Sequence, residues 1–165
     1  MKVRILSPQA RGAVALFVRC PRHLEDLLVR ELDALGLEEV AARTGGVQVR
    51  ADLAGAVRVC LHSRIASRVL WPLASFEAPD ADALYAGTAQ IDWDRYVRGT
   101  PRLAVDFDGT SPTLRHTRFS AQRVKDAVVD GLRSARGVRP DVDARDPELH
   151  VQGVLHRGRV TLHLD

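Results

Sequence analysis

Cysteine, lysine and aromatic residues are scarce in this chain of 165 residues. The two cysteines, Cys20 and Cys60, do not form a spaced metal-ligand set and stand beside apolar residues. We therefore expect reduced, buried thiols in a cytosolic protein. Aromatic residues make up 5%, which argues against the extended stacking surfaces of sequence-tolerant single-strand binding. No apolar run approaches the length that crosses a bilayer, and residues 1–13 lack the apolar middle of a secretory signal, so we expect a soluble, cytoplasmic protein without a membrane partner.

The charge of the chain is carried by arginine. Of the 24 basic residues only Lys2 and Lys125 are lysine, and 21 acids leave a net charge of +3. Arginine grips phosphate with two parallel hydrogen bonds and stacks on bases, whereas lysine acts as a point charge. The mild basic excess permits a polyanionic partner without requiring one. The length suffices for one sizeable core or two small ones.

The basic residues concentrate between residues 113 and 140, where seven cations face two acids. Small and apolar residues recur there at helical spacing and predict a helix over residues 120–135. Ser120 is predicted as its N-cap, Gly137 as the left-handed residue after its last turn, and Pro140 as its stop.

The loop before this helix, residues 113–119, brings two of these cations and a histidine to the positive end of the helix. Arg115, His116 and Arg118 would meet backbone N–H groups and the helix dipole at one place, which suits a phosphate. A solvated helix face and, for His116, a loop residue in water are the alternatives. Two aromatic residues, Phe119 and Trp93, could lie near this surface, and we expect both to be core or connector anchors.

The first half of the chain predicts a ferredoxin-like fold. Its elements are a strand at 14–18, a helix at 21–36, strands at 39–43 and 47–50, a helix after Asp52, and a strand at 63–76. Pro21 suits the first helical turn, Gly36 ends that helix, and Asp52 caps the second. The apolar positions expected to be buried are Leu24, Leu27, Leu28, Leu32 and Leu35 on the first helix and Leu53, Ala56, Val57, Cys60 and Leu61 on the second. The order of these elements is the split βαβ plan.

The second half predicts a mixed sheet with one face covered. Asp80 caps a short helix that ends at Ala89, and the aromatic segment around Trp93 connects the two halves. The elements after it are a strand at 102–107, the basic helix, a polar loop at 141–147, and strands at 149–155 and 159–164 that meet in a hairpin turn at residues 157–158. The predicted fold class is therefore α+β.

The sequence DxDGT at residues 106–110 follows an apolar strand and resembles the nucleophile loop of haloacid-dehalogenase phosphatases. That chemistry also needs a lysine and further acids on later strands, and the residues after Thr110 offer one lysine and no acidic pair on a recognisable strand. An Asp-Gly turn at the end of a strand is the simpler interpretation. The six histidines are scattered, which makes a metal site improbable. We therefore predict neither catalytic nor metal-binding residues.

Several separated blocks together resemble one family of RNA-modifying enzymes. The blocks are FVRCPRHLEDLLVRELDALG at 17–36, SRIASRVL at 63–70, the Leu-Tyr at 84–85, the Ile-Asp-Trp at 91–93 and VKDAVVD at 124–130. They occur in the order found in bacterial 23S rRNA guanine-N2 methyltransferases of the RlmL (RlmKL) type. The resemblance runs from about residue 14 to the C-terminus. It implies a ferredoxin-like domain packed on a THUMP domain, both binding RNA, ahead of methyltransferase domains that use S-adenosylmethionine.

The resemblance also implies domain bounds and site residues. We expect a leader at 1–12, a ferredoxin-like lead-in at 13–62 whose final strand extends as far as 77, and a THUMP domain at 63–165. By match to its blocks, the resemblance implies RNA contacts for Arg64, Arg68, Arg115 and Lys125. The basic loop and helix add His116, Arg118, Arg123 and Arg133 to the predicted RNA-binding residues. The chain itself would hold no cofactor and perform no methyl transfer. The alternatives are a tRNA-binding THUMP module, a small phosphatase and a protein-interaction domain.

Overall fold

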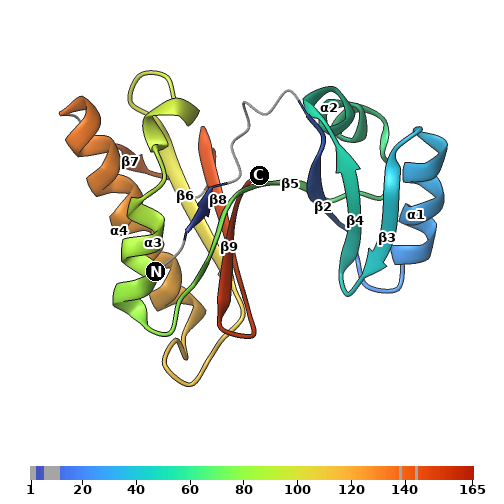
Figure 1. Ribbon diagram of the computed structural model, residues 1–165. Helices are drawn as coiled ribbons and strands as arrows, with labels where there is room; N and C mark the ends of the chain where they lie inside the picture. The colour runs from blue at the N-terminus through green and yellow to red at the C-terminus, as the bar shows by residue number, and fades with distance from the viewer. Residues whose placement is uncertain (1–2, 6–11, 138, 144) are drawn as a thin grey trace. The chain divides into compact units, whose positions relative to one another are not determined.

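The computed structural model describes residues 3–5, 12–137, 139–143 and 145–165 (Figure 1). The chain divides into two compact units. The N-terminal unit comprises Ser7–Pro72 and Asp165, and the C-terminal unit comprises Met1–Leu6 and Leu73–Leu164. Strand β5, Arg68–Glu77, contributes its first half to the former and its second half to the latter.

The N-terminal unit has the ferredoxin-like order of elements that the sequence predicts. Its elements are β2 (Val14–Arg19), α1 (Glu25–Ala34), β3 (Glu38–Arg43), β4 (Gly46–Ala51), α2 (Leu53–His62) and the first half of β5. The strand order is β3-β4-β2-β5, and each neighbouring pair is antiparallel. Leu16 and Val18 of β2 and Val49 of β4 are fully buried with Leu28 and Leu32 of α1. Alternation in the strands and helical spacing in α1 therefore supply one shared core.

Two helix starts in this unit test the capping rules. Asp52 caps α2, as predicted, and accepts the Gly55 N–H at 2.8 Å. The prediction that Pro21 opens the first helix is wrong, because α1 begins at Glu25. The Glu25 carboxylate accepts the Gly45 N–H at 3.0 Å, and hydrogen bonds from backbone N–H groups lower its pKa. This carboxylate thus joins the start of α1 to the turn between β3 and β4.

The predicted apolar stripe of α2 is wrong at four of its five positions, and only Ala56 is buried as predicted. Its buried positions are Gly55, Ala56 and Val59, whereas Leu53, Val57 and Leu61 are exposed. A Cβ on Gly55 would lie 2.8 Å from the Ala51 side chain and 3.2 Å from Leu37, so the helix approaches the sheet at this glycine. On α1, likewise, Leu24 and Leu27 are exposed.

The two cysteines differ from each other in this unit. Cys20 is buried as predicted, and burial raises the pKa of its thiol. Cys60 is exposed, so the prediction of a buried thiol there is wrong. Both cysteines are free.

The C-terminal unit contains the mixed sheet that the sequence predicts. Its elements are β1 (Arg4–Ile5), the second half of β5, α3 (Ala81–Ala89), the 3₁₀ helix η1 (Trp93–Tyr96), β6 (Arg102–Asp108), α4 (Thr117–Arg136), β7 (Asp141–Val142), β8 (Leu149–His156) and β9 (Arg159–Leu164). The strand order is β5-β9-β8-β6-β7, in which β6 runs parallel to β7 and β8, and β8 antiparallel to β9. Strand β1 pairs with Ala74 and Ser75 of β5, unlike the irregular leader that the sequence predicts, and the rest of that leader except Val3 and Gly12 lies outside the described residues.

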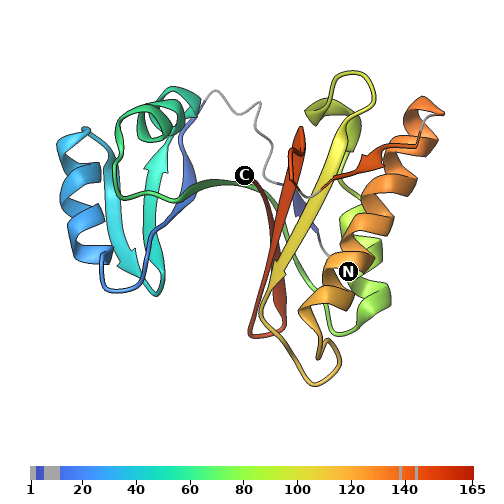
Figure 2. The same cartoon turned by 180° about the vertical axis from the view of Figure 1, so that it is seen from behind.

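Helices α3 and α4 lie side by side on one face of this sheet, which both views show (Figures 1 and 2). Phe76 of β5 fills the space over Gly87 of α3, where a Cβ would come within 2.4 Å of the ring. Trp93 is buried and donates from its indole N–H to the Thr88 carbonyl at 3.0 Å, which confirms it as a core anchor. The prediction that the segment around it connects the two halves is wrong, because this segment lies within the C-terminal unit and β5 spans the boundary between the units. Across the described residues, no helix is both long and apolar enough for a membrane span.

Helix α4 begins earlier than predicted. Its first residue is Thr117, and the N-cap is His116, whose side chain makes no capping hydrogen bond. Ser120 lies inside the helix, fully buried, with its hydroxyl donating to the His116 carbonyl at 3.3 Å. The prediction of Ser120 as the cap is therefore wrong. The end is as predicted, since Gly137 has a left-handed φ of 70°.

Candidate nucleic-acid interface

Three exposed basic side chains stand where α4 begins. Arg115 and His116 precede the first turn and Arg118 lies within it. We call these three residues the cationic cluster. The Arg115 Nε donates to the Pro112 carbonyl at 2.8 Å, and among the described residues no carboxylate pairs with Arg115 or Arg118. The structure thus brings together the three basic loop residues that the sequence singles out.

The loop that carries the cluster is held by short-range hydrogen bonds. The Ser111 N–H donates to the Leu114 carbonyl at 3.1 Å, and the Leu114 N–H donates to the Ser111 hydroxyl at 3.0 Å. Leu114 itself is fully buried, and the Thr113 hydroxyl donates to the Pro79 carbonyl. The loop that precedes the cluster is therefore fixed to the body of the unit.

The electrostatics of this helix end favour an anion. The first turn of α4 contains no acid, so the positive end of its dipole is left uncompensated. A cation in this position costs a helix about 0.3–1 kcal/mol, and Arg118 is such a cation. A bound phosphate would meet the N–H groups of the first turn and the guanidinium groups together.

Arg123, another predicted site residue, fastens α4 to α3. Its guanidinium pairs with Asp82 at 2.9 Å and lies 4.9 Å from the centre of the Tyr85 ring. The Tyr85 hydroxyl in turn donates to Asp130 at 2.6 Å, and this hydrogen bond raises the pKa of Tyr85. Arg123 is therefore engaged in an intramolecular contact that RNA would have to share or displace.

Lys125 and Arg133 lie farther along the helix. The Lys125 ammonium is 3.3 Å from Asp126, which also accepts the Gln122 amide N–H at 2.8 Å. Arg133 is exposed and lines a surface hollow of about 440 Å³. The other residues that line it are Tyr85, Arg123, Asp126, Val129, Asp130 and Arg139. The outer face of α4 thus has cations at both ends and two acids, Asp126 and Asp130, between them.

Arg136 supports the fold. Its guanidinium pairs with Asp94 and donates to the carbonyls of Gly99 at 2.7 Å and Val97 at 2.6 Å. These contacts tie the end of α4 to the connector after η1. The seven cations of this stretch therefore do not act as one uniform basic surface.

The two predicted site residues of the N-terminal unit lie in a loop and at the start of β5. Residues 63–66 wrap around the Glu31 carboxylate, which accepts the Ser63 hydroxyl and, at 2.9 Å, the Arg64 N–H. Burial raises the pKa of Glu31, but these hydrogen bonds outweigh it and hold that pKa below its usual range. Because of this loop, β5 begins at Arg68 and not at the predicted Ser63.

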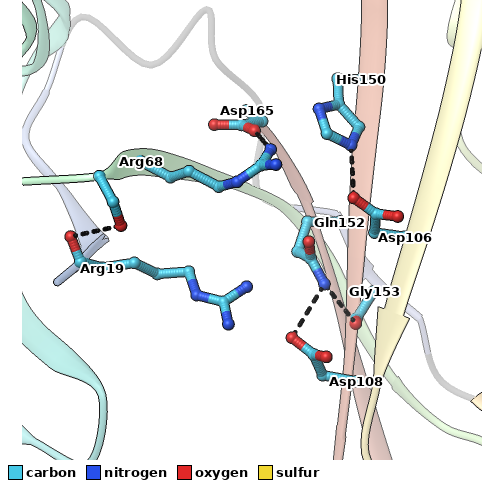
Figure 3. A network of polar contacts seen from close by, with 9 residues as sticks. Arg19, Arg68, Asp106, Asp108, His150, Gln152, Gly153 and Asp165 are labelled. Carbon is cyan, nitrogen blue, oxygen red and sulfur yellow. Dashed lines mark hydrogen bonds and ion pairs between the residues drawn. The ribbon is translucent and has the colours of Figure 1, made fainter. Parts of the chain in front are cut away.

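The side chains of Arg64 and Arg68 have different surroundings. Arg64 is exposed, whereas Arg68 is half-buried and pairs with Asp165 (Figure 3). Both arginines belong to the N-terminal unit. The loop that carries Arg64 is therefore ordered by Glu31, a residue that the sequence analysis did not single out.

Both carboxylates of the DxDGT sequence make hydrogen bonds to side chains of the neighbouring strand β8 in the C-terminal unit. Asp106 lies 2.9 Å from the His150 Nε2, and Asp108 accepts the Gln152 amide N–H at 3.2 Å (Figure 3). Strand β6 ends at Asp108, and Gly109 follows with a left-handed φ of 91°. This geometry is a strand end with an Asp-Gly turn, and it does not favour the phosphatase.

Within the described part of the chain, no three His, Cys, Asp or Glu residues gather closely enough to hold a metal ion. Phe119, which the sequence analysis predicts as a core anchor, is 50% exposed beside the cationic cluster. Helical spacing from Leu132 back to Ser120 could have placed it on the outer face, since Ser120 takes the buried position next to it.

The protein is therefore an α+β protein with a surface suited to anions. It has a ferredoxin-like unit, then a mixed sheet covered by helices, and an exposed cationic cluster. The family model described as the RlmL ferredoxin-like domain matches residues 15–70, and that of the THUMP domain matches residues 78–165. The chain belongs to the THUMP domain family.

Relatives and solved structures agree with that family. The chain is 45% identical over 150 residues to ribosomal RNA large subunit methyltransferase K/L of Pseudomonas entomophila, and 42% identical over 149 residues to the protein of that name from Cellvibrio japonicus. These matches cover 91% and 90% of the chain but 20% of each relative. The crystal structure of a predicted N6-adenine-specific DNA methylase from Listeria monocytogenes matches with a TM-score of 0.78 at 22% identity, over 95% of this chain and 41% of that one, and shows the shared fold.

Proposed function

We propose that this chain is the RNA-binding portion of an rRNA methyltransferase and that it captures structured RNA at the cationic cluster. The observation that carries the proposal is the set of exposed cations at the start of α4, which no described carboxylate neutralises. Membership of the THUMP family and the names of the two relatives support the choice of RNA as the anion. Phosphate contacts supply most of the affinity in such an interface.

The proposal includes the work of the whole enzyme. The RNA is the 23S rRNA of the large ribosomal subunit, in the cytoplasm, and the reaction is methylation of a guanine at N2. Methyltransferase domains outside this chain would bind S-adenosylmethionine and perform the reaction. The chain spans about a fifth of the length of the relatives it matches, which leaves ample length for such domains in them.

The predicted RNA-binding residues differ in whether they already form an ion pair within the fold. Arg115, His116 and Arg118 can bind phosphate without giving up an ion pair to a described residue. The other predicted RNA-binding residues are Arg64, Arg68, Arg123, Lys125 and Arg133. Arg68, Arg123 and Lys125 pair with Asp165, Asp82 and Asp126, so RNA contacts there would compete with those pairs. We therefore expect the cationic cluster to contribute most of the phosphate affinity.

The experiment is a binding titration of this chain against a hairpin from 23S rRNA and against a tRNA, at several salt concentrations. The proposal predicts salt-dependent binding with a preference for the rRNA hairpin. Binding to neither RNA at low salt would refute it, and a preference for tRNA would favour a tRNA-modifying parent. A double variant, Arg115→Ala with Lys125→Ala, should weaken binding while the fold is retained. A protein-interaction domain would instead form a complex with a protein partner that ribonuclease leaves intact.

A further inference from the structure

Phe119 is the one exposed side chain among the eight aromatic residues of the chain, all of which lie within the described residues. It is 50% exposed, whereas the adjacent Ser120 is fully buried. A phenylalanine gains about 1.5–3 kcal/mol from full burial, so an outward position in a helix forgoes much of that gain. The folding of α4 gives no reason for an aromatic residue at this position.

Phe119 stands next to the cationic cluster in the chain. It lies in the first turn of α4, one position after Arg118 and three after His116, all exposed. The loop before it is fixed by the hydrogen bonds of Ser111 and by the buried Leu114. An aromatic ring on a rigid helix, with cations beside it, provides stacking for a base and charge for its phosphates without a large loss of side-chain entropy.

We propose that Phe119 is a stacking platform for one unpaired nucleotide, whose neighbouring phosphates are held by Arg115 and Arg118. This inference rests on the proposed function and adds to it the kind of RNA segment that the surface takes. The bases of a regular duplex are stacked on one another and do not reach a protein ring, whereas a loop, a bulge or a strand end offers a free base. The ligand class is therefore single-stranded RNA or an unpaired nucleotide within a folded RNA.

The test compares a short oligouridine with a blunt RNA duplex of equal length, using the whole chain. Stacking of one base on an aromatic side chain changes affinity by roughly fivefold to a hundredfold, so Phe119→Ala should weaken oligouridine binding within that range and leave duplex binding unchanged. Phe119→Leu keeps an apolar side chain and should behave like the alanine variant. Phe119→Trp should retain binding, and its indole fluorescence should be quenched by oligouridine.

The salt dependence separates this role from that of the cluster. Phe119→Ala should lower affinity at every salt concentration without changing the slope of log affinity against log salt, because stacking releases no counterions. Arg115→Ala should reduce the magnitude of that slope. Circular dichroism of each variant checks that α4 is retained.

Several results would overturn the inference. Equal oligouridine affinity for Phe119→Ala and the unmodified chain would refute stacking while leaving RNA binding intact. An equal loss for duplex and single strand would also refute it. If the unmodified chain bound no RNA, the proposed function itself would fail, which is a distinguishable result.

Discussion

Acidification from pH 7 to pH 5 should destabilise the C-terminal unit through His163, a residue of β9. The side chain of His163 is 8% exposed, and its Nδ1 makes no hydrogen bond to any described residue. Burial lowers the pKa of His163 from 6.5 to about 4, while a hydrogen bond with the backbone of Gln152 opposes the shift. The folded unit therefore holds this imidazole neutral at pH values where the unfolded chain would protonate it.

The sign and size of the effect follow from proton linkage. Between pH 6.5 and pH 4 the unfolded state binds more protons than the folded state, so stability is present above this window and is lost as the pH falls through it. With a folded pKa of about 4, the loss reaches about 2 kcal/mol at pH 5 and about 3 kcal/mol at pH 4, relative to pH 7. Such a loss is a large fraction of the stability of a small domain.

The assay is urea unfolding at about pH 7, 6 and 5, followed by the fluorescence of the buried Trp93 in a Trp71→Phe background. Trp93 belongs to the C-terminal unit and Trp71 to the N-terminal unit, so the signal reports the unit that contains His163. His163→Met should flatten the dependence on pH over this range. The matched control His156→Gln, at an exposed histidine, should leave it unchanged. An unmodified chain that is equally stable at pH 7 and pH 5 would refute the reasoning.

Three further variants test the packing. Glu31→Gln should lower the free energy of unfolding by about 1–3 kcal/mol, because the Ser63 hydroxyl and the Arg64 N–H lose a charged acceptor. Below about pH 4.5 the unmodified chain loses the stability that ionised Glu31 contributes, and the variant should not show that loss. An unchanged unfolding free energy would contradict this. Gly87→Ala should cost roughly 1–3 kcal/mol because its Cβ would lie 2.4 Å from the Phe76 ring, and an unchanged unfolding free energy in the Trp93 assay would contradict this. Arg136→Ala should lower stability by about 2 kcal/mol yet leave the RNA affinity of the folded protein unchanged, and a selective loss of RNA affinity would show that Arg136 contacts RNA.

The parts of the fold that local rules govern could be predicted from the sequence. Asp52 and Asp80 cap α2 and α3, and each accepts the N–H three residues later at 2.8 Å. The hairpin turn is also where it was predicted, because Arg157 and Gly158 both have the positive φ that a two-residue turn needs. Capping and turn formation depend on neighbours in sequence, so one sequence suffices for them.

The sequence-based predictions are wrong where contacts between residues far apart in the chain determine the structure. Helix α2 has an apolar stripe at Leu53, Val57 and Leu61, yet it packs through the face of Gly55, because a Cβ at Gly55 would lie 2.8 Å from the Ala51 side chain and the helix approaches the sheet there. The start of β5 depends on the distant Glu31, which no local pattern around Ser63 could show.

The candidate site was predicted in part. The sequence grouped Arg115, His116 and Arg118 in one loop, and the structure places them together at the start of α4. It could not show that Arg123 pairs with Asp82, because that contact depends on how α4 packs against α3.

The most direct test of RNA capture by the cationic cluster is the salt slope of RNA binding for the unmodified chain and for Arg115→Ala with Arg118→Ala. Each lost phosphate contact should reduce the magnitude of the slope by about 0.7 for a single strand, and by about 0.9 for a duplex that behaves like B-form DNA. The matched control is Arg159→Ala, which removes an exposed arginine that pairs with Glu77 in the same unit. The account predicts a clearly smaller slope for the double variant and an unchanged slope for the control. Equal slopes for the double variant and the unmodified chain would contradict the central claim.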